Sequence, residues 1–112
     1  MRIAKEIKTM EEFKAIQAES NSIPVLLCKF SPICPISSEA ESQFNEYLQT
    51  DPIGVSFYRI DVVYARETAR GLAKEIEVKH ESPQALLFKN GKCVWNESHH
   101  HLTKEVFLSK VK

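Results

Sequence analysis

The sequence predicts an α/β fold in which helices cover both faces of one mixed central sheet. Two observations predict it. Strand-like and helix-like segments alternate along most of the chain, and residues 24–30 form an almost unbroken apolar run. Such a run is typical of a strand covered by helices on both faces. With 112 residues, the chain is long enough for one core of this kind, so we expect a single domain over residues 1–112.

A short strand over residues 3–7 is expected to open the fold. Thr9 and Glu12 then form a capping-box pattern before a helix that should end near residue 21. The apolar run of residues 24–30 is predicted to be the middle strand of the sheet. A helix from Cys34 to about Gln49 follows, with five apolar residues repeating on one face: Ile36, Ala40, Phe44, Tyr47 and Leu48.

The second half of the chain continues the alternation. Residues 55–61 are predicted to form a strand, and residues 65–76 carry small and apolar side chains at helical spacing. Strands over residues 84–89 and 92–96 flank Asn90-Gly91, the dipeptide favoured in a two-residue type I′ hairpin turn. Thr103 can cap a last helix. The predicted order is βαβαβαββα, with the last two strands antiparallel.

The composition argues against some classes of binding partner and indicates the cellular compartment. Lys plus Arg total 15 and Asp plus Glu total 15, so no net charge attracts nucleic acid. No apolar run approaches the roughly 20 residues that cross a bilayer, and the charged N-terminal segment does not resemble a signal peptide. The odd number of cysteines favours reduced thiols over a secreted disulfide framework. We expect a cytoplasmic monomer that binds neither nucleic acid nor membrane.

Cys34 is the leading candidate for chemistry. It follows a buried strand and starts an amphipathic helix, so free backbone N–H groups and the helix dipole point at its sulfur and favour the thiolate. Pro35 suits the first turn, because the N–H that proline lacks would have no helical partner there. The alternative is that Cys34 is a small buried hydrophobe, as many unpaired cysteines are.

Two further positions bear on the chemistry of Cys34. Ser37 stands where a dithiol oxidoreductase carries its resolving cysteine, so a Cys34 adduct would need a second molecule to release it. Ser37 can also be interpreted as an exposed residue of the first helical turn. Pro83 precedes a strand and can be trans or cis, a choice that spacing leaves open. In the cis form, Ser82 could hydrogen-bond a peptide or small thiol beside Cys34.

The remaining cysteines and histidines have weaker functional signals. Cys28 lies on the middle strand, where packing is the first interpretation, a secondary redox role the second, and a disulfide with Cys34 an open hypothesis. Cys93, after the hairpin, is expected to be remote from Cys34. The three histidines of residues 99–101 are expected in a loop and not at a metal site, because three consecutive side chains cannot all face one ion. No segment indicates a bound cofactor.

The motifs Cys34-Pro35-Ile36-Ser37 and Ser82-Pro83, with the predicted element order, resemble the thioredoxin superfamily. The closer resemblance is to the monothiol bacilliredoxins, the YtxJ-like family, and it spans almost the whole chain. Four further stretches carry it: residues 78–84, Lys89-Asn90-Gly91, Val94-Trp95, and Ser98-His99 with Leu102-Thr103.

The resemblance implies a thioredoxin-like three-layer α/β/α sandwich and a monothiol thiol–disulfide oxidoreductase. Cys34 would be the nucleophile, Ser37 would replace the resolving cysteine, and Pro83 would be the cis-proline facing the active site, with Pro35, Ile36 and Ser82 as neighbours. The implied reaction removes bacillithiol, or a similar low-molecular-weight thiol, from S-thiolated client proteins. That thiol would be a co-substrate, with no bound organic cofactor. The alternative is a thioredoxin-fold redox sensor or adaptor that turns over no substrate.

Two features depart from the family pattern. The segment Ser31-Pro32-Ile33 replaces a stretch that is rich in Ser and Thr in the family. Cys28 occupies the position at which many thioredoxins carry a buried acid that assists proton transfer. That assistance is therefore not available in its usual form.

Overall fold

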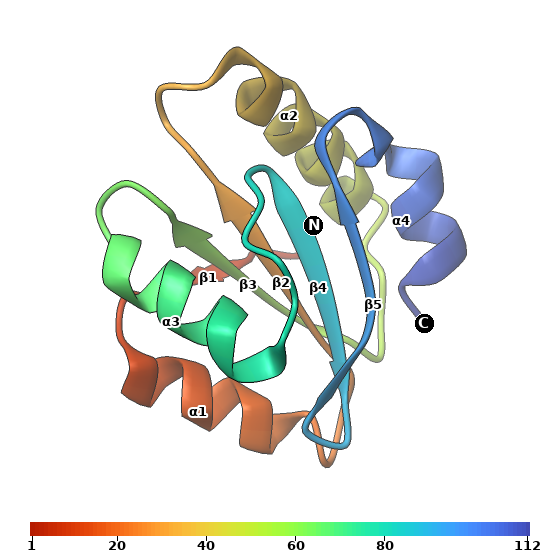
Figure 1. The fold of residues 1–112 in the computed structure, drawn as a ribbon. Coiled ribbons are helices and arrows are strands. Elements are labelled where there is room, and N and C mark those ends of the chain that lie inside the picture. The colour runs from red at the N-terminus through yellow and green to blue at the C-terminus, as the bar shows by residue number, and fades with distance from the viewer.

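A computed structural model describes residues 1–112 of the protein. Its strands form one sheet in the order β1-β3-β2-β4-β5 (Figure 1). The strands are β1 (Lys5–Glu6), β2 (Val25–Phe30), β3 (Ser56–Asp61), β4 (Gln84–Lys89) and β5 (Lys92–Ser98). The helices are α1 (Met10–Glu19), α2 (Pro35–Gln49), α3 (Arg66–Ile76), α4 (Lys104–Lys110) and the short 3-10 turn η1 (His99–His101). None of the helices is long and apolar enough to cross a membrane.

Strand β2 is the middle of the sheet, as the apolar run predicts. It pairs in parallel with β3 and antiparallel with β4, so that Cys28 lies between Arg59 and Ala85. All six of its residues are buried. The sheet is mixed, because β1 is parallel to β3 while β4 and β5 are antiparallel.

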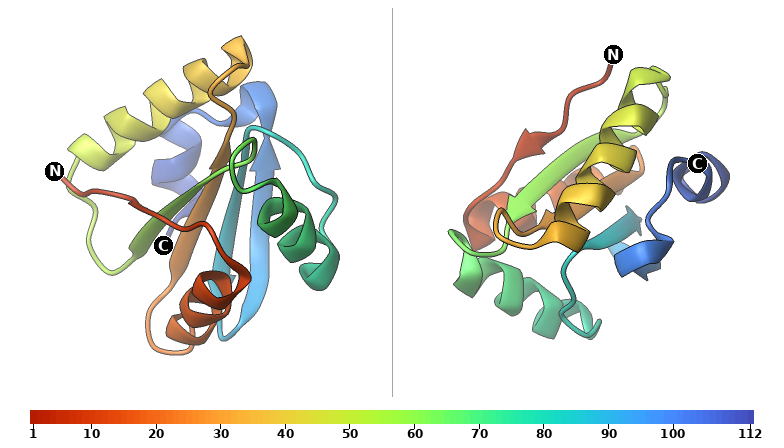
Figure 2. Two further views of the ribbon diagram at one scale, coloured as in Figure 1. Left: turned by 90° about the vertical axis from the view of Figure 1, so that its left-hand side faces the viewer. Right: turned by 90° about the horizontal axis from the view of Figure 1, so that it is seen from above.

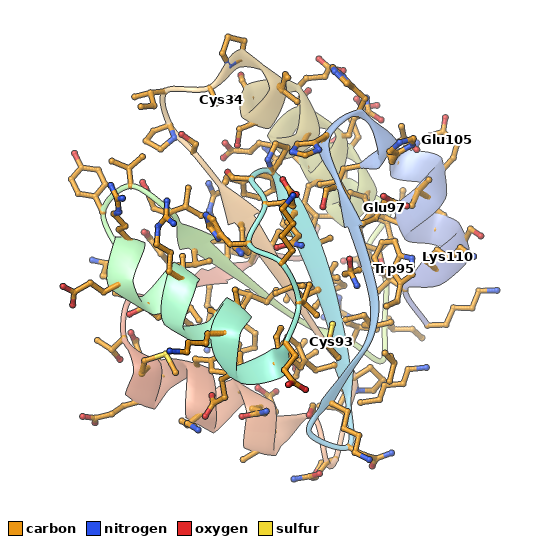
Figure 3. The ribbon with its side chains drawn as sticks, in the orientation of Figure 1. Cys34, Cys93, Trp95, Glu97, Glu105 and Lys110 are labelled. Atoms are coloured by element: carbon orange, nitrogen blue, oxygen red, sulfur yellow. The ribbon has the colours of Figure 1, made fainter.

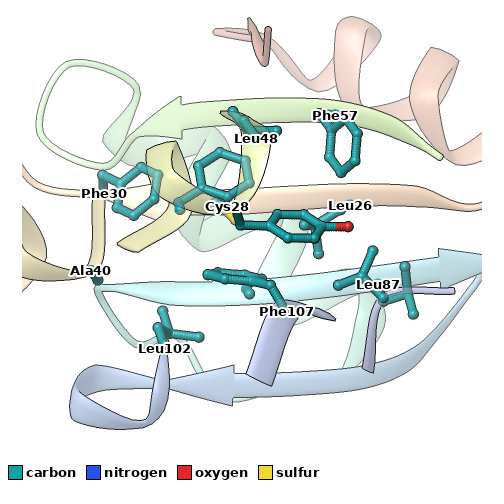
Figure 4. Packing of buried hydrophobic residues seen from close by; sticks show 13 residues of the cluster. Leu26, Cys28, Phe30, Ala40, Leu48, Phe57, Leu87, Leu102 and Phe107 are labelled. Carbon is teal, nitrogen blue, oxygen red and sulfur yellow. The ribbon is translucent and has the colours of Figure 1, made fainter. Parts of the chain in front are cut away.

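Helices cover both faces of the sheet and divide the core into two clusters. Figure 2 shows α1 and α3 on one side of the sheet and α2 and α4 on the other. Because side chains alternate along a strand, Leu26, Cys28 and Phe30 of β2 pack with α2 and α4, whereas Val25 and Leu27 pack with α1 and α3. On the α2 side the core is aromatic (Figure 4), and its ring pairs include Phe44–Phe107, Tyr47–Phe107 and Phe30–Phe44.

Three local predictions are confirmed by backbone geometry. Thr9 and Glu12 form the reciprocal capping box at the start of α1. Asn90 (φ 54°) and Gly91 (φ 79°) both have positive φ between the paired residues Lys89 and Lys92, as a type I′ turn requires. The peptide bond between Ser82 and Pro83 is cis, which decides the question that spacing leaves open.

Three element predictions need correction. Strand β1 spans Lys5–Glu6 and not residues 3–7, because only these two residues pair with β3, and the Arg2 N–H donates to the Leu48 carbonyl instead. Strand β5 extends to Ser98. The histidines of residues 99–101 form a 3-10 turn and not an open loop.

Two Gly→Ala variants should change stability in opposite directions. Gly91→Ala forces an L side chain into positive φ and should lower the free energy of unfolding by about 1 kcal/mol. Gly71→Ala lies inside α3, where the added Cβ would meet only the Met10 sulfur at 3.5 Å, an ordinary contact. It should raise stability by about 0.5–1 kcal/mol. Urea unfolding of the two variants checks both signs, and equal shifts would contradict the turn assignment.

Candidate functional site

Cys34 is the N-cap of α2, directly before Pro35 at the first helical position. Its carbonyl accepts from the Ser38 N–H at 3.1 Å, so the helix begins at this residue. Its side chain makes no capping hydrogen bond, and its sulfur is a free, partly exposed thiol. The backbone amides of Ile36 and Ser37 have no acceptor within the protein. The thiol therefore lies at the start of the helix, beside two backbone amides that are free to donate a hydrogen bond.

Ser37 is fully buried, which contradicts its interpretation as a water-exposed helix residue. Its Oγ accepts from the Ser31 N–H at 2.7 Å. This hydrogen bond joins the first turn of α2 to the residue that follows β2. The side chain at the resolving position therefore anchors the Cys34 loop.

Ile36 was expected on the buried face of α2, and the structure shows that it is 37% exposed. The first turn of α2 projects past the end of the sheet, and Ser37, not Ile36, faces inward. Ile33, immediately before the thiol, is 80% exposed. Cys34 thus lies between two exposed apolar side chains. A hollow of about 180 Å³ adjoins Ile36, and its lining residues are Ile36, Glu39, Ala40, Gln43, His99, His100, Leu102 and Thr103.

The Ser82–Pro83 pair lies at the same edge of the sheet as Cys34. Strand β2 ends at Phe30 just before the Cys34 loop, and β4 starts at Gln84, which pairs with Lys29 near that end of β2. No hydrogen bond joins the two segments directly. The Oγ of Ser82 is buried and has no partner.

A buried lysine side chain lies next to the Ser82–Pro83 segment. Lys29 is completely buried, and its Nζ donates to Gln84 Oε1 at 2.9 Å. Burial lowers the pKa of Lys29 to about 8, with Glu81 opposing and Arg70 adding to the shift. His80 is close to the same charges, and burial followed by Lys29 and Arg70 lowers its pKa. The Nδ1 atom of His80 is buried without a partner.

Comparison with known proteins identifies the family. The family model described as monothiol bacilliredoxin BrxC matches residues 5–107. The chain belongs to the monothiol bacilliredoxin family. A solved structure described as a candidate oxidoreductase with a thioredoxin fold is 32% identical to this bacilliredoxin, with a TM-score of 0.85, and the match covers 98% of this chain and 95% of the other. The family and this neighbour support a thiol–disulfide redox function.

More distant structures agree on the fold of the bacilliredoxin. The thioredoxin of Malassezia sympodialis is 17% identical with a TM-score of 0.76, and the match covers 99% of this chain and 90% of the other. The Fasciola hepatica thioredoxin is 18% identical with a TM-score of 0.75, covering 96% and 95%. The predicted thioredoxin-like sandwich is therefore confirmed.

The other two cysteines of the bacilliredoxin lie away from the exposed thiol. Cys28 is fully buried in the aromatic cluster (Figure 4), and burial raises the pKa of its thiol, so packing is its supported role. Cys93 pairs with Phe88, which pairs with Val25 at the start of β2. Cys93 therefore lies at the opposite end of the sheet from Cys34, as Figure 3 shows. Burial raises the pKa of Cys93 as well.

Sequence reasoning missed the buried polar group of the bacilliredoxin. Its signal was a single lysine inside an otherwise apolar strand, Val25–Phe30. A second signal was His80 close before Ser82-Pro83. No polar contact was predicted for His99, and the structure places its Nε2 3.2 Å from Glu81 Oε2. No group of three or more His, Cys, Asp or Glu side chains is arranged to hold a metal ion.

Ser37→Ala should destabilise the bacilliredoxin by about 1–2 kcal/mol, because it leaves the Ser31 N–H without its acceptor. Ser38→Ala is the matched control, since Ser38 is the next residue and is exposed. It should change stability by less than about 0.5 kcal/mol. Chemical denaturation of both variants measures the difference. Equal effects would show that the Ser37 hydroxyl does not anchor the loop.

Lys29→Met should make the bacilliredoxin more stable at pH 7 by roughly 2–3 kcal/mol, because it removes an ammonium that burial disfavours. The folded state has the lowered pKa, so between pH 8 and 10 the unfolded chain binds more protons and the wild type gains stability. The advantage of Lys29→Met should therefore shrink as the pH rises through this range. Lys79→Met, at an exposed lysine, is the control. A variant that is less stable at pH 7 would contradict the burial cost.

Proposed function

We propose that the protein is a monothiol thiol–disulfide oxidoreductase that removes bacillithiol, or a similar low-molecular-weight thiol, from protein mixed disulfides through Cys34. The observation that carries the proposal is one partly exposed thiol at a helix start, with no second cysteine near it. Ser37, at the resolving position, has no sulfur, and its oxygen is already bonded to the Ser31 N–H. Cys28 is sealed in the core and Cys93 lies at the far end of the sheet.

The reaction consists of two exchanges at this sulfur. The Cys34 thiolate attacks the small-thiol sulfur of the mixed disulfide. A Cys34–S–S–small-thiol bond forms, the client S–S bond breaks, and the client thiolate leaves and takes a proton from solvent. A second small-thiol thiolate then attacks the adduct, which releases the oxidised small-thiol dimer and restores the Cys34 thiolate. The client sulfur is reduced, and one free small thiol is oxidised as it forms the dimer with the small thiol that the client carried.

The surroundings of Cys34 support binding of a polypeptide client. Ile33 and Ile36 offer apolar contact on either side of the thiol. The backbone of Ser82, directly before the cis-proline, is the proposed hydrogen-bond partner of the client or the small thiol. The hollow between α2 and the 3-10 turn offers space beside Ile36 for part of the adduct. The proposed partners are S-thiolated proteins and the small thiol, acting on a monomer in the reducing cytoplasm without a bound cofactor.

Cys34→Ser should abolish reduction of an S-bacillithiolated client, because a hydroxyl is not a nucleophile toward disulfide sulfur at neutral pH. Cys93→Ser is the matched control and should retain the activity, since Cys93 lies at the other end of the sheet. Release of the small thiol from the client, followed by intact mass, measures both variants. Native-rate reduction by Cys34→Ser would end the proposal.

The identity of the small thiol can be determined in a separate experiment. The wild type is incubated with oxidised bacillithiol, coenzyme A or glutathione, and the mass added at Cys34 names the thiol that it accepts. Transfer of that adduct to a second small thiol marks an oxidoreductase. An adduct that forms but is never released would favour the redox-sensor alternative.

A further inference from the structure

A lysine at the position of Lys29 lowers the stability of the fold. It is 0% exposed on the middle strand, within an otherwise apolar segment. A buried ammonium loses its hydration, and an apolar side chain of similar length would be accommodated there without that cost. Fold stability therefore does not explain a lysine at this place.

The contacts of Lys29 lead to the loop that carries the cis-proline. Its Nζ donates to Gln84 Oε1 at 2.9 Å. The Gln84 amide in turn donates through Nε2 to the Lys79 carbonyl at 3.1 Å, and its Oε1 accepts from the Glu81 N–H at 3.4 Å. One glutamine thus holds residues 79 and 81 together, and the buried ammonium fixes the orientation of its amide.

The same loop is held from its other side by His99. The His99 N–H donates to the Pro83 carbonyl at 3.0 Å, and its Nε2 lies 3.2 Å from Glu81 Oε2. Contacts from β2 and from the 3-10 turn therefore both restrain residues 79–83. Within this frame the Ser82 hydroxyl is buried without a partner.

We propose that Lys29 is a positioning residue that acts through Gln84 to hold the Ser82–Pro83 segment ready to bind the mixed disulfide. This inference rests on the proposed function of Cys34. Lys29 does not touch the sulfur or the substrate; it restricts the loop, so that less conformational entropy is lost when a client binds beside it. Its effect therefore falls on substrate binding and not on the reactivity of the thiol.

The test compares Lys29→Met, Gln84→Met and the double variant in the full chain. Each single variant should raise KM for an S-bacillithiolated client about tenfold, because the loss of one hydrogen bond that orders the loop changes binding by about that factor. The value of kcat should change less than twofold. The double variant should be no worse than the worse single variant, because Lys29 acts on the loop only through Gln84. The rate of Cys34 alkylation by iodoacetamide should stay at the wild-type value. Lys92→Met, at an exposed lysine outside this loop, is the control.

Hydrogen–deuterium exchange provides a readout that does not depend on turnover. Lys29→Met should speed exchange of residues 79–84 and leave α2 (Pro35–Gln49) unchanged. Unchanged KM and exchange, additive KM effects, or a parallel fall in Cys34 alkylation would overturn the positioning role. A wild type that reduces no mixed disulfide would instead sink the proposed function, and the exchange measurement would still decide whether Lys29 holds the loop.

Discussion

The central position of β2 is the constraint on which the site depends. The strand is paired on both edges and buried on both faces, so its end is fixed relative to β3 and β4. The Cys34 loop starts at that end, and β4, with the cis-proline before it, starts opposite. The Cys34 thiol and the cis-proline loop, which are far apart in sequence, are thereby brought to one edge of the sheet.

One face of β2 contributes mainly to stability, and the other carries a polar contact near the candidate site. On the α2 side, aromatic packing around Phe44 and Phe107 anchors the helix that carries Cys34, and the Arg59–Glu41 ion pair of 2.7 Å ties this helix to β3. On the α3 side, Lys29 is buried at a cost in stability. A stable core can tolerate that cost, so a polar restraint on the Ser82–Pro83 loop is compatible with a small fold.

Most of the fold could be predicted from local sequence patterns. The rest depends on contacts between segments that are far apart in the sequence, and local patterns do not reveal these contacts. The capping box at Thr9, the turn at Asn90-Gly91 and the apolar run of β2 each specify their structure within a few residues. The Cys34 motif predicted the helix start in the same way. Nothing local places Lys29 against Gln84, 55 residues later, or His99 against Glu81. The cis state of Pro83 was likewise left open by its neighbours.

The structure also changes the meaning of Ser37. In the sequence, this serine is notable because it stands where a dithiol oxidoreductase would carry its resolving cysteine. In the fold, its oxygen is a short-range acceptor for the Ser31 N–H and holds the loop between β2 and α2. A sulfur there would be a weaker and longer acceptor, so a cysteine would gain a resolving thiol and loosen the loop that presents Cys34. The absence of a resolving thiol and the geometry of the loop are therefore linked through a single side chain.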